Sequence, residues 1–470
     1  MGTALILGVG MLRFGKLLNL SVKDLAARAL DSTLADAGVG RDQIQAVWFA
    51  NSGWGFNGGQ DCIRGQVALR PSGIGAVPIV NVENACAGGA TALHGAWLSV
   101  QSGECDAVLA IGVEKLVQRE RLRTFASFLG GMDVEALPRL IEQAKELRAQ
   151  FPAPEPAHVE RASHGRARNA GASRGRSSPE PTLPKTLFDL LVIADHFRID
   201  LRAMLRDAVK ERLQRPMGRG TKGMNHSPFM DVYAIAARRH MAEFGSTQAQ
   251  LAIIAAKNHD HGAKNPMAQI QQAMLPEQVL ADKAVAYPLT RAMCAPLGDG
   301  AAAALVCSER FAKRFGAGRA VKLRASVIES GSSADPREGI TARASRRAYA
   351  AGGVGPEDLH LAEVHDATAF GELSQSEALG FCESGAGGVF AESGATRLGG
   401  RLPLNTSGGL ESRGHPIAAS GLAQICELVM QLRGEAGARQ VQGARMALAQ
   451  NGGGMLDGEE AAVGIHVLEA

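Results

Sequence analysis

Apolar residues along the chain recur with two different spacings, and segments of the two kinds alternate from one end of the sequence to the other. Short apolar runs predict buried strands at 3–10, 46–49, 76–80, 107–111, 301–307, 361–364 and 445–449. Helical spacing predicts helices at 22–37, 90–100, 136–149, 198–213, 231–243, 340–351 and 418–432, and a further one capped by Ser246 or Thr247. Strands that alternate with helices imply parallel sheets covered by helices, so the pattern predicts an α/β fold.

One order of elements occurs twice in the chain, which predicts an internal duplication. The predicted helix 22–37 leads through Gly38-Val39-Gly40 to a strand, and the helix 340–351 leads through Gly353-Val354-Gly355 to another. Cys86 precedes a helix, a glycine turn and a strand, and His415 precedes the same series. Two related halves packed together would therefore bring the Cys86 and His415 turns to one pocket.

Residues 121–226 have no counterpart in either half, and we interpret them as an inserted loop or lid region. Within this insertion, 151–185 is rich in Pro, Arg, Ser, Gly and Ala, a composition typical of disorder. The expected domains are an N-terminal half formed by 1–120 and 227–312 and a C-terminal half formed by 313–470.

Composition excludes several classes of function. The chain of 470 residues is 46% hydrophobic and 21% charged, as is ordinary for a globular protein. Its net charge of +3 predicts neither a nucleic-acid nor a membrane partner, and no apolar run is long enough to span a bilayer. Seven scattered cysteines without metal-ligand spacing indicate reduced thiols in the cytoplasm and no metal site. His259-Asp260-His261 fits a polar helix end better than a metal site.

Four stretches carry candidate chemistry: Asn84-Ala85-Cys86-Ala87-Gly88-Gly89, Glu363-Val364-His365-Asp366-Ala367-Thr368, the glycine-rich loop from Asn405 to Pro416 that contains His415, and Gln450-Asn451-Gly452-Gly453-Gly454. Most free cysteines are inert core residues. Cys86, however, is expected at a strand-to-helix turn, where the helix dipole favours the thiolate. The three glycines expose N–H groups that suit an oxyanion hole. Together these residues suit acyl transfer from a thioester.

These motifs resemble the thiolase superfamily. The His365-Asp366 dipeptide, together with the opening Gly8-Val9-Gly10-Met11, is most similar to the sterol-carrier-protein-type (lipid-transfer-like) thiolases. The resemblance covers about 1–120 and 227–470. It implies the thiolase fold, in which two βαβαβαββ halves pack as αβαβα layers, here with a large loop insertion.

The resemblance also implies roles for single residues. Cys86 would accept the acyl group, His415 would act as its base, and His365 would be an oxyanion-hole or base residue. The backbone of Cys86 and of the glycine turn Gly452, Gly453 and Gly454 would form a second oxyanion hole, and Asn405, Ser407 and Gly408 would contact substrate. Coenzyme A would be a substrate, with no tightly bound cofactor. A homodimer or a dimer of dimers is expected, and some relatives of the His-Asp type act with a small zinc-ribbon/OB-fold partner chain.

The second cysteine of thiolases is absent from both of its usual positions, where this chain has Ala367 and Gln450-Asn451. Either His365 takes over proton transfer, or the reaction is not an ordinary acetyl-CoA thiolysis; Cys294 and Cys382 are the alternative thiols. The leading hypothesis is an acyl-CoA C-acyltransferase that works by 3-oxoacyl-CoA thiolysis or the reverse Claisen condensation through acyl-Cys86. The alternatives are a specialised condensing or acyl-transfer enzyme with a non-acetyl acceptor, and a non-catalytic acyl-CoA-binding subunit.

Overall fold

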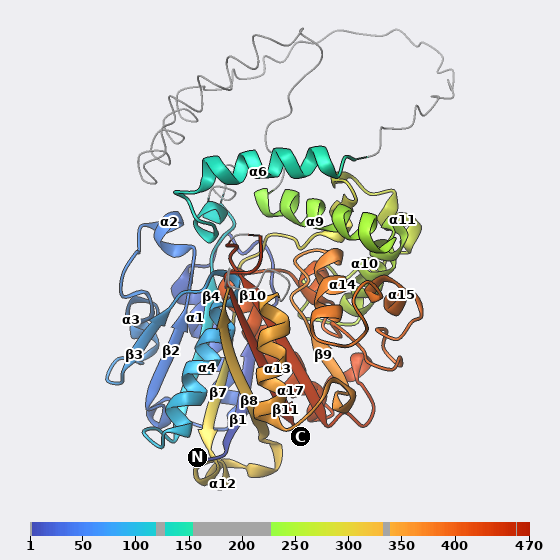
Figure 1. The fold of residues 1–470 in the computed structure, drawn as a ribbon. Helices are drawn as coiled ribbons and strands as arrows, with labels where there is room; N and C mark the ends of the chain where they lie inside the picture. The colour runs from blue at the N-terminus through green and yellow to red at the C-terminus, as the bar shows by residue number, and fades with distance from the viewer. Residues whose placement is uncertain (1, 119–126, 154–226, 332–338, 457) are drawn as a thin grey trace, which may run out of the picture. The chain divides into compact units, whose positions relative to one another are not determined.

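The computed structural model describes residues 2–118, 127–153, 227–331, 339–456 and 458–470 (Figure 1). These belong almost entirely to one compact unit, formed by Met1–Phe151 and His226–Ala470. The predicted helix at 198–213 and the disorder predicted for 151–185 lie outside the described residues, apart from the first three positions of the latter. The helix predicted at 136–149 is confirmed as α6 (Leu137–Gln150).

The first half is a five-stranded part of the central sheet in the order β3-β2-β4-β7-β1. Its strands are β1 (Ala4–Met11), β2 (Ala46–Ala50), β3 (Ile79–Val82), β4 (Ala107–Glu114) and β7 (Gly300–Ser308). The connecting helices are α1 (Val22–Ala37), α3 (Arg64–Leu69) and α4 (Gly88–Gln101). This half therefore has the expected βαβαβαββ order.

The second half repeats this arrangement with four strands in the order β8-β11-β10-β9. They are β8 (Val321–Ser330), β9 (Leu361–Glu363), β10 (Met446–Gly453) and β11 (Ala462–Glu469). The place of the fifth strand is taken by an isolated parallel bridge between Ala362 and Leu404. The duplication predicted from the sequence is thus visible in the topology, while the predicted domain boundaries stay a prediction.

The layers follow from the faces that the helices bury. One apolar cluster joins α4 and α17 (Ser420–Leu432) to strands of both halves, so these two helices form the middle layer. A second cluster covers the other face of the first half with α1, and a third covers the second half with α13 (Ile340–Gly352). The result is the αβαβα order that the family resemblance implies (Figure 1).

The prediction of purely parallel sheets is wrong in one respect. β7 runs antiparallel to β1 and β4, and β11 runs antiparallel to β8 and β10. In the second half the reason is direct: only 454–461 separate β10 from β11, and so short a connection joins antiparallel neighbours.

The remaining helices lie beside the carboxyl ends of the strands or at the edges of the fold. They are α2 (Trp54–Gly58), α9 (Pro228–Phe244), α10 (Gln248–Ala263), α11 (Pro276–Leu280), α12 (Glu309–Phe315), α14 (Ala369–Ala378), α15 (Gly387–Glu392) and α16 (Gly409–Arg413), with a small pair of strands β5 (Ala284–Ala286) and β6 (Leu289–Thr290). Of the two predicted caps, Thr247 caps α10, where its hydroxyl accepts the backbone N–H of Gln250. Among the described residues, no helix combines the length and apolar character that crossing a bilayer requires.

Candidate active site

Cys86 lies in a single turn of 3₁₀ helix, Ala85–Ala87, between β3 and α4. The residue before it, Ala85, has a φ of 46°, a left-handed conformation that an alanine rarely adopts. Strain of this kind persists where the surrounding structure fixes the chain, and it is common at reactive positions. The sequence prediction of a tight strand-to-helix turn at Cys86 is confirmed.

The glycine turn at the end of β10 packs directly against this cysteine turn. A Cβ on Gly453 would lie 2.2 Å from the carbonyl oxygen of Asn84 and 2.3 Å from the nitrogen of Ala87. Only glycine allows so close an approach of the two backbones. Gly452 and Gly453 belong to β10, and the backbone N–H of Gly454, the next residue, favours the ionised form of the Cys86 sulfur.

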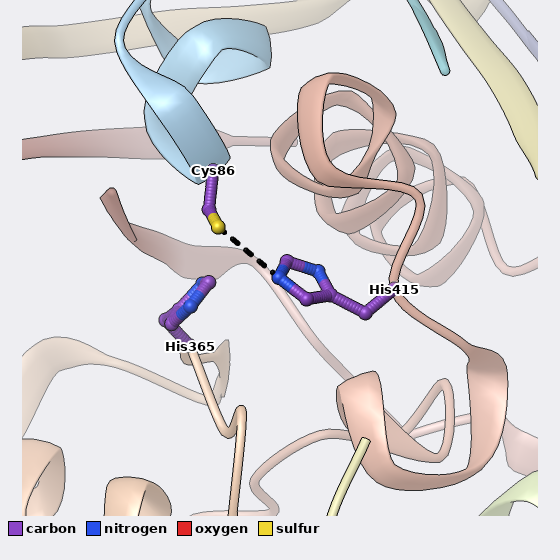
Figure 2. Close-up of side chains that lie close together, drawn as sticks. All are labelled: Cys86, His365 and His415. Atoms are coloured by element: carbon purple, nitrogen blue, oxygen red, sulfur yellow. Dashed lines mark hydrogen bonds between the residues drawn. The ribbon is translucent and has the colours of Figure 1, made fainter. Parts of the chain in front are cut away.

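His415 approaches the cysteine from the other half of the molecule. The Cys86 thiol donates a hydrogen bond to Nε2 of His415, with 3.2 Å between the sulfur and the nitrogen (Figure 2). Nδ1 of His415 lies 2.7 Å from the hydroxyl of Ser420, and that hydroxyl gives its one proton to the carbonyl of Pro416 at 3.0 Å. Ser420 must therefore accept a proton from Nδ1, which leaves Nε2 free to act as a base.

The protonation states differ from the sequence expectation. Desolvation raises the pKa of Cys86 to about 12, and the negative charges of Glu114 and Glu83 act in the same direction. The N–H groups of Gly454 and of Cys86 itself lower this pKa but do not outweigh burial. The prediction that the turn favours the thiolate is thus wrong for the resting protein. Burial also lowers the pKa of His415 well below its usual value, so a neutral thiol faces a neutral imidazole.

His365 completes a group of three side chains. It follows β9, its ring centre is 5.2 Å from that of His415, and the nearest ligand atoms of Cys86, His365 and His415 all lie within 4.8 Å of one another. Nδ1 of His365 accepts a hydrogen bond from the amide of Asn451 at 3.0 Å, so the ring proton is on Nε2. Burial lowers the pKa of His365 to about 4, which keeps it a neutral hydrogen-bond donor.

Among the described residues, Cys86, His365 and His415 are also the group whose ligand atoms are spaced closely enough to hold a metal ion. In this structure the imidazole of His415 instead accepts the thiol proton, as the chemistry of a nucleophile and its base requires. The geometry of Cys86 and His415 therefore suits acyl transfer from a thioester.

A buried polar network fixes the loop that carries His415. Arg413 and Glu363 are completely buried and form an ion pair at 3.0 Å. Asp366, next to His365, accepts the backbone N–H of Leu410 at 2.7 Å and the amide of Asn258 at 3.1 Å. Burial and the neighbouring Glu372 raise the pKa of Asp366 well above its usual value. These bonds orient the two histidine-bearing segments relative to each other.

The three residues expected to contact substrate lie within this network. Asn405 is fully buried, donates to Glu372 at 2.8 Å and accepts the backbone N–H of Val364 at 2.9 Å. Ser407 donates its hydroxyl to Glu363 at 2.5 Å, and Gly408 lies directly after it with a φ of 97°. Their polar contacts support the histidine loop, and substrate contact by Asn405, Ser407 and Gly408 stays a prediction.

The alternative thiols point elsewhere. Cys294 forms a bridge to Thr368 through its backbone, yet its sulfur donates to the carbonyl of Thr290 at 3.3 Å and packs with an apolar cluster around α10. Cys382 follows α14, and burial raises its pKa to about 12. Neither thiol belongs to the group formed by Cys86 and the two histidines.

The other residues considered as metal ligands are structural. His259 bonds the carbonyl of Ala292 at 3.0 Å, and Nδ1 of His261 bonds that of Asn405 at 3.1 Å. Both lie at the predicted helix end, but they are buried in it. Ser420 and Asn451 set the tautomers of the two site histidines and were not identified from the sequence. A helix-start serine and an amide in a strand have other common roles, so the sequence carried no signal that singled them out.

Comparison with known proteins identifies the family of the chain. Residues 4–136 match the model of the "Thiolase, N-terminal domain" family, and 328–465 match that of the "Thiolase C-terminal domain-like" family. The chain is 31% identical over 455 residues to "Acetyl-CoA acetyltransferase" from Methanothermobacter thermautotrophicus, covering 96% of each protein. It is 32% identical over 459 residues to "Sterol carrier protein 2" from Bos taurus, covering 95% of this chain and 69% of that protein.

Among solved structures, the "Ltp2-ChsH2(DUF35) aldolase" is similar, with a TM-score of 0.67 and 21% sequence identity, covering 100% of this chain and 98% of that one. At this identity the likeness concerns the fold alone. The family matches, and the relative from Methanothermobacter thermautotrophicus that is similar over nearly its whole length, show more than the fold. The chain belongs to the thiolase family and is an acyltransferase.

Proposed function

We propose that this acyltransferase cleaves a 3-oxoacyl-CoA with coenzyme A, or runs the reverse Claisen condensation, through an acyl-Cys86 intermediate. One observation carries the proposal: the Cys86 thiol faces Nε2 of His415, and Ser420 keeps that nitrogen free of a proton. A nucleophile, its base and a group that orients the base form the arrangement that covalent acyl transfer needs.

The resting protonation states define the first step. Because the pKa of Cys86 is raised and that of His415 is lowered, the proton moves only as the sulfur attacks a carbonyl. Negative charge then develops on the carbonyl oxygen, where backbone N–H groups of Cys86 and Gly454 would hold it. Nε2–H of His365 is a further neutral donor for a thioester oxygen, and its low pKa suits it to this role better than to that of a base.

A second candidate differs in the acceptor. Ala367 and Gln450-Asn451 stand at the two places where thiolases carry a second thiol. The missing thiol favours, as the alternative, condensation or acyl transfer to an acceptor other than acetyl-CoA. A non-catalytic acyl-CoA-binding subunit is the third candidate. The intact contact between Cys86 and His415 speaks against it, because a binding subunit needs no oriented base.

The assembly belongs to the same proposal. We expect a homodimer or a dimer of dimers in the cytoplasm, with coenzyme A as a substrate. The similar solved structure, the "Ltp2-ChsH2(DUF35) aldolase", is named for two components, and this supports the expected small partner chain for the present protein as well.

Thiolysis assays on a panel of 3-oxoacyl-CoAs test the proposal, with product masses determined for several acceptors and with candidate partners added. The expected result is consumption of one chain-length class, with formation of a shortened acyl-CoA and acetyl-CoA. Saturable binding of CoA esters without any turnover would contradict it. His365→Ala is expected to slow turnover strongly, and full turnover in this variant would remove His365 from the site chemistry.

A further inference from the structure

Cleavage of the substrate's carbon–carbon bond needs a group that donates a proton to carbon, and none of the side chains named so far fits this role. If the proposed function holds, the departing carbon needs a proton, which thiolases obtain from their second thiol. Ala367 has no acidic proton, and the Gln450 amide is engaged with the backbone N–H of His365 at 2.8 Å. His365 has a pKa of about 4, so near neutral pH it is not the imidazolium ion that could give a proton to carbon.

Glu460 lies beside the glycine turn without a cationic partner. It precedes β11, and its carboxyl group fills the space next to Gly452: a Cβ there would be 2.9 Å from its Oε1. Gly452 is two residues from Gly454, whose N–H favours ionisation of the Cys86 sulfur. Glu460 is half-buried, and no Lys, Arg or His of the described ranges forms an ion pair with it.

A glutamine holds the carboxyl group in place. The Gln375 amide donates to Oε1 of Glu460 at 2.6 Å. Gln375 lies on α14, which begins four residues after His365, so this bond ties Glu460 to the segment that carries the site histidine. Gln375 is only 6% exposed, yet its own Oε1 has no hydrogen-bond partner. A buried polar atom left unsatisfied points to a group that the free protein lacks.

Tyr233 of α9 is a phenol whose pKa responds to the charges of both the carboxyl group and the nucleophile. Burial raises this pKa well above the usual value, and the charges of Glu460, Cys86 and Asp366 add to the rise. Phe229, one helical turn earlier on α9, would be 3.2 Å from a Cβ on Gly131, and the carbonyl of Gly131 accepts the N–H of Met455 at 2.8 Å. This face of α9 therefore lies beside the glycine turn, against which both Glu460 and the Cys86 turn pack.

We propose that Glu460 is the acid/base that exchanges a proton with the α-carbon of the substrate thioester, and that Gln375 is its positioning residue. In cleavage, the Cys86 sulfur bonds to C3 and its proton goes to His415. The C2–C3 bond breaks, its electron pair forms the enolate of acetyl-CoA, and protonated Glu460 gives its proton to C2. When the thiol of coenzyme A takes the acyl group, its proton returns to Glu460, and His415 returns its own proton to Cys86.

The physical chemistry suits a carboxyl group. Burial raises the pKa of Glu460 above that of an ordinary glutamate, which moves it toward neutral pH, where one group can both donate and accept a proton. Its neighbour Glu459 has a different task, because it accepts the backbone N–H of Ile340 at 2.9 Å at the start of α13.

The test compares Glu460→Gln with the neighbouring Glu459→Gln in three measurements on the full chain: thiolysis, acylation of Cys86 by a simple acyl-CoA, and deuterium entry into the methyl group of acetyl-CoA in D₂O. Glu460→Gln is expected to lose about 10²- to 10⁴-fold in thiolysis and to lose deuterium entry, while acylation stays within about threefold of wild type. Glu459→Gln is expected to keep all three. Thiolysis and deuterium entry near wild type in Glu460→Gln overturn the proposal.

Two further variants test the acid/base role of Glu460 and the positioning role of Gln375 separately. Glu460→Asp retains a carboxyl group but shortens the side chain. If deuterium entry falls more than acylation in this variant, the proposal is supported. If deuterium entry and acylation fall equally in both Glu460→Asp and Glu460→Gln, the proposal is overturned. Gln375→Leu removes a bond that lowers the pKa of Glu460, so the high-pH limb of thiolysis should move to higher pH. An unmoved limb overturns the positioning role. Failure of wild-type Cys86 to acylate would instead reject the proposed function itself.

Discussion

The Cys86 turn of the first half and the His415 loop of the second half both lead into a central helix, α4 or α17. Residues 84–86 keep some exposure, and the turn is built from alanine, glycine and backbone contacts. Residues 405–415 are all buried and are held by ion pairs and hydrogen bonds to carboxylates. The two copies of one topology therefore differ: the first leaves its thiol partly exposed, and the second uses buried charged residues to orient its histidine.

Because Cys86 and His415 are in contact, we expect the two turns to act as one catalytic unit. Cys86→Ala and His415→Gln should each lower kcat by about 10³-fold or more, because each removes one member of the nucleophile–base pair. The double variant should be no worse than the poorer single variant. Losses that multiply in the double variant would show that the turns contribute separately.

A second prediction concerns the cost of orienting the base. Arg413→Met leaves the buried carboxylate of Glu363 without its partner, and the free energy of unfolding should fall by about 3–5 kcal/mol in urea denaturation. Arg291→Met is the matched control, since Arg291 pairs with Asp282 on the surface and should change stability by less than about 1 kcal/mol. Equal effects of both substitutions would contradict the difference drawn between the halves.

The tautomer of His365 gives a third prediction. In Asn451→Asp the new carboxylate accepts a proton from Nδ1, so Nε2 loses the proton with which it donates to the substrate oxygen. Turnover at pH 7 should fall by about 10²-fold and recover partly at lower pH, where the imidazole carries both protons. The pH–rate profile of the variant measures this. Turnover within about threefold of wild type at pH 7 would mean that the amide of Asn451 does not set the tautomer.

The smallest expected effect lies where the halves join. Asp36 of α1 accepts hydrogen bonds from the backbone N–H of Val9 and from Arg433, which follows α17, each at 2.8 Å. Burial raises the pKa of Asp36, but the hydrogen bonds from Arg433 and Val9 together outweigh this effect. The net shift of the pKa is therefore downward.

A lowered pKa in the folded state stabilises the fold above the unfolded value of about 4, and this contribution is lost as the pH falls through the folded pKa. Asp36→Asn should cost about 1 kcal/mol of unfolding free energy at pH 7. The difference from wild type should begin to shrink at about pH 4 and disappear once the pH is below the lowered pKa of folded Asp36. Chemical denaturation across this range measures it, and a difference that persists unchanged at low pH would exclude the ionised form as its source.

The sequence predicted the parts of this account that depend on local pattern. Apolar spacing located β1, α1, α4 and α17. The glycine-flanked motifs predicted that Cys86 and His415 lie close together, because each precedes a helix at the equivalent place in its half. The sheet direction of β7 and the protonation of Cys86 were not predictable in this way. The first depends on how strands far apart in sequence pair, and the second on the balance between desolvation and a few backbone amides.

The residues that orient the two histidines could not be predicted from the sequence either. Asn451 and His365 are 86 positions apart, and Arg413 and Glu363 are 50 apart, so their contacts exist only in the folded chain. Glu460 illustrates the same limit, since a glutamate before a strand is ordinary until the fold places it against Gly452 without a cation.

Mass spectrometry of the intact protein and of its peptides, after brief incubation with an acyl-CoA at neutral pH, tests the central claim most directly. The account predicts one added acyl group on the peptide that contains Cys86, and no addition in Cys86→Ala. Wild-type protein that stays unmodified while it turns over substrate, or an adduct that persists in Cys86→Ala, would contradict it.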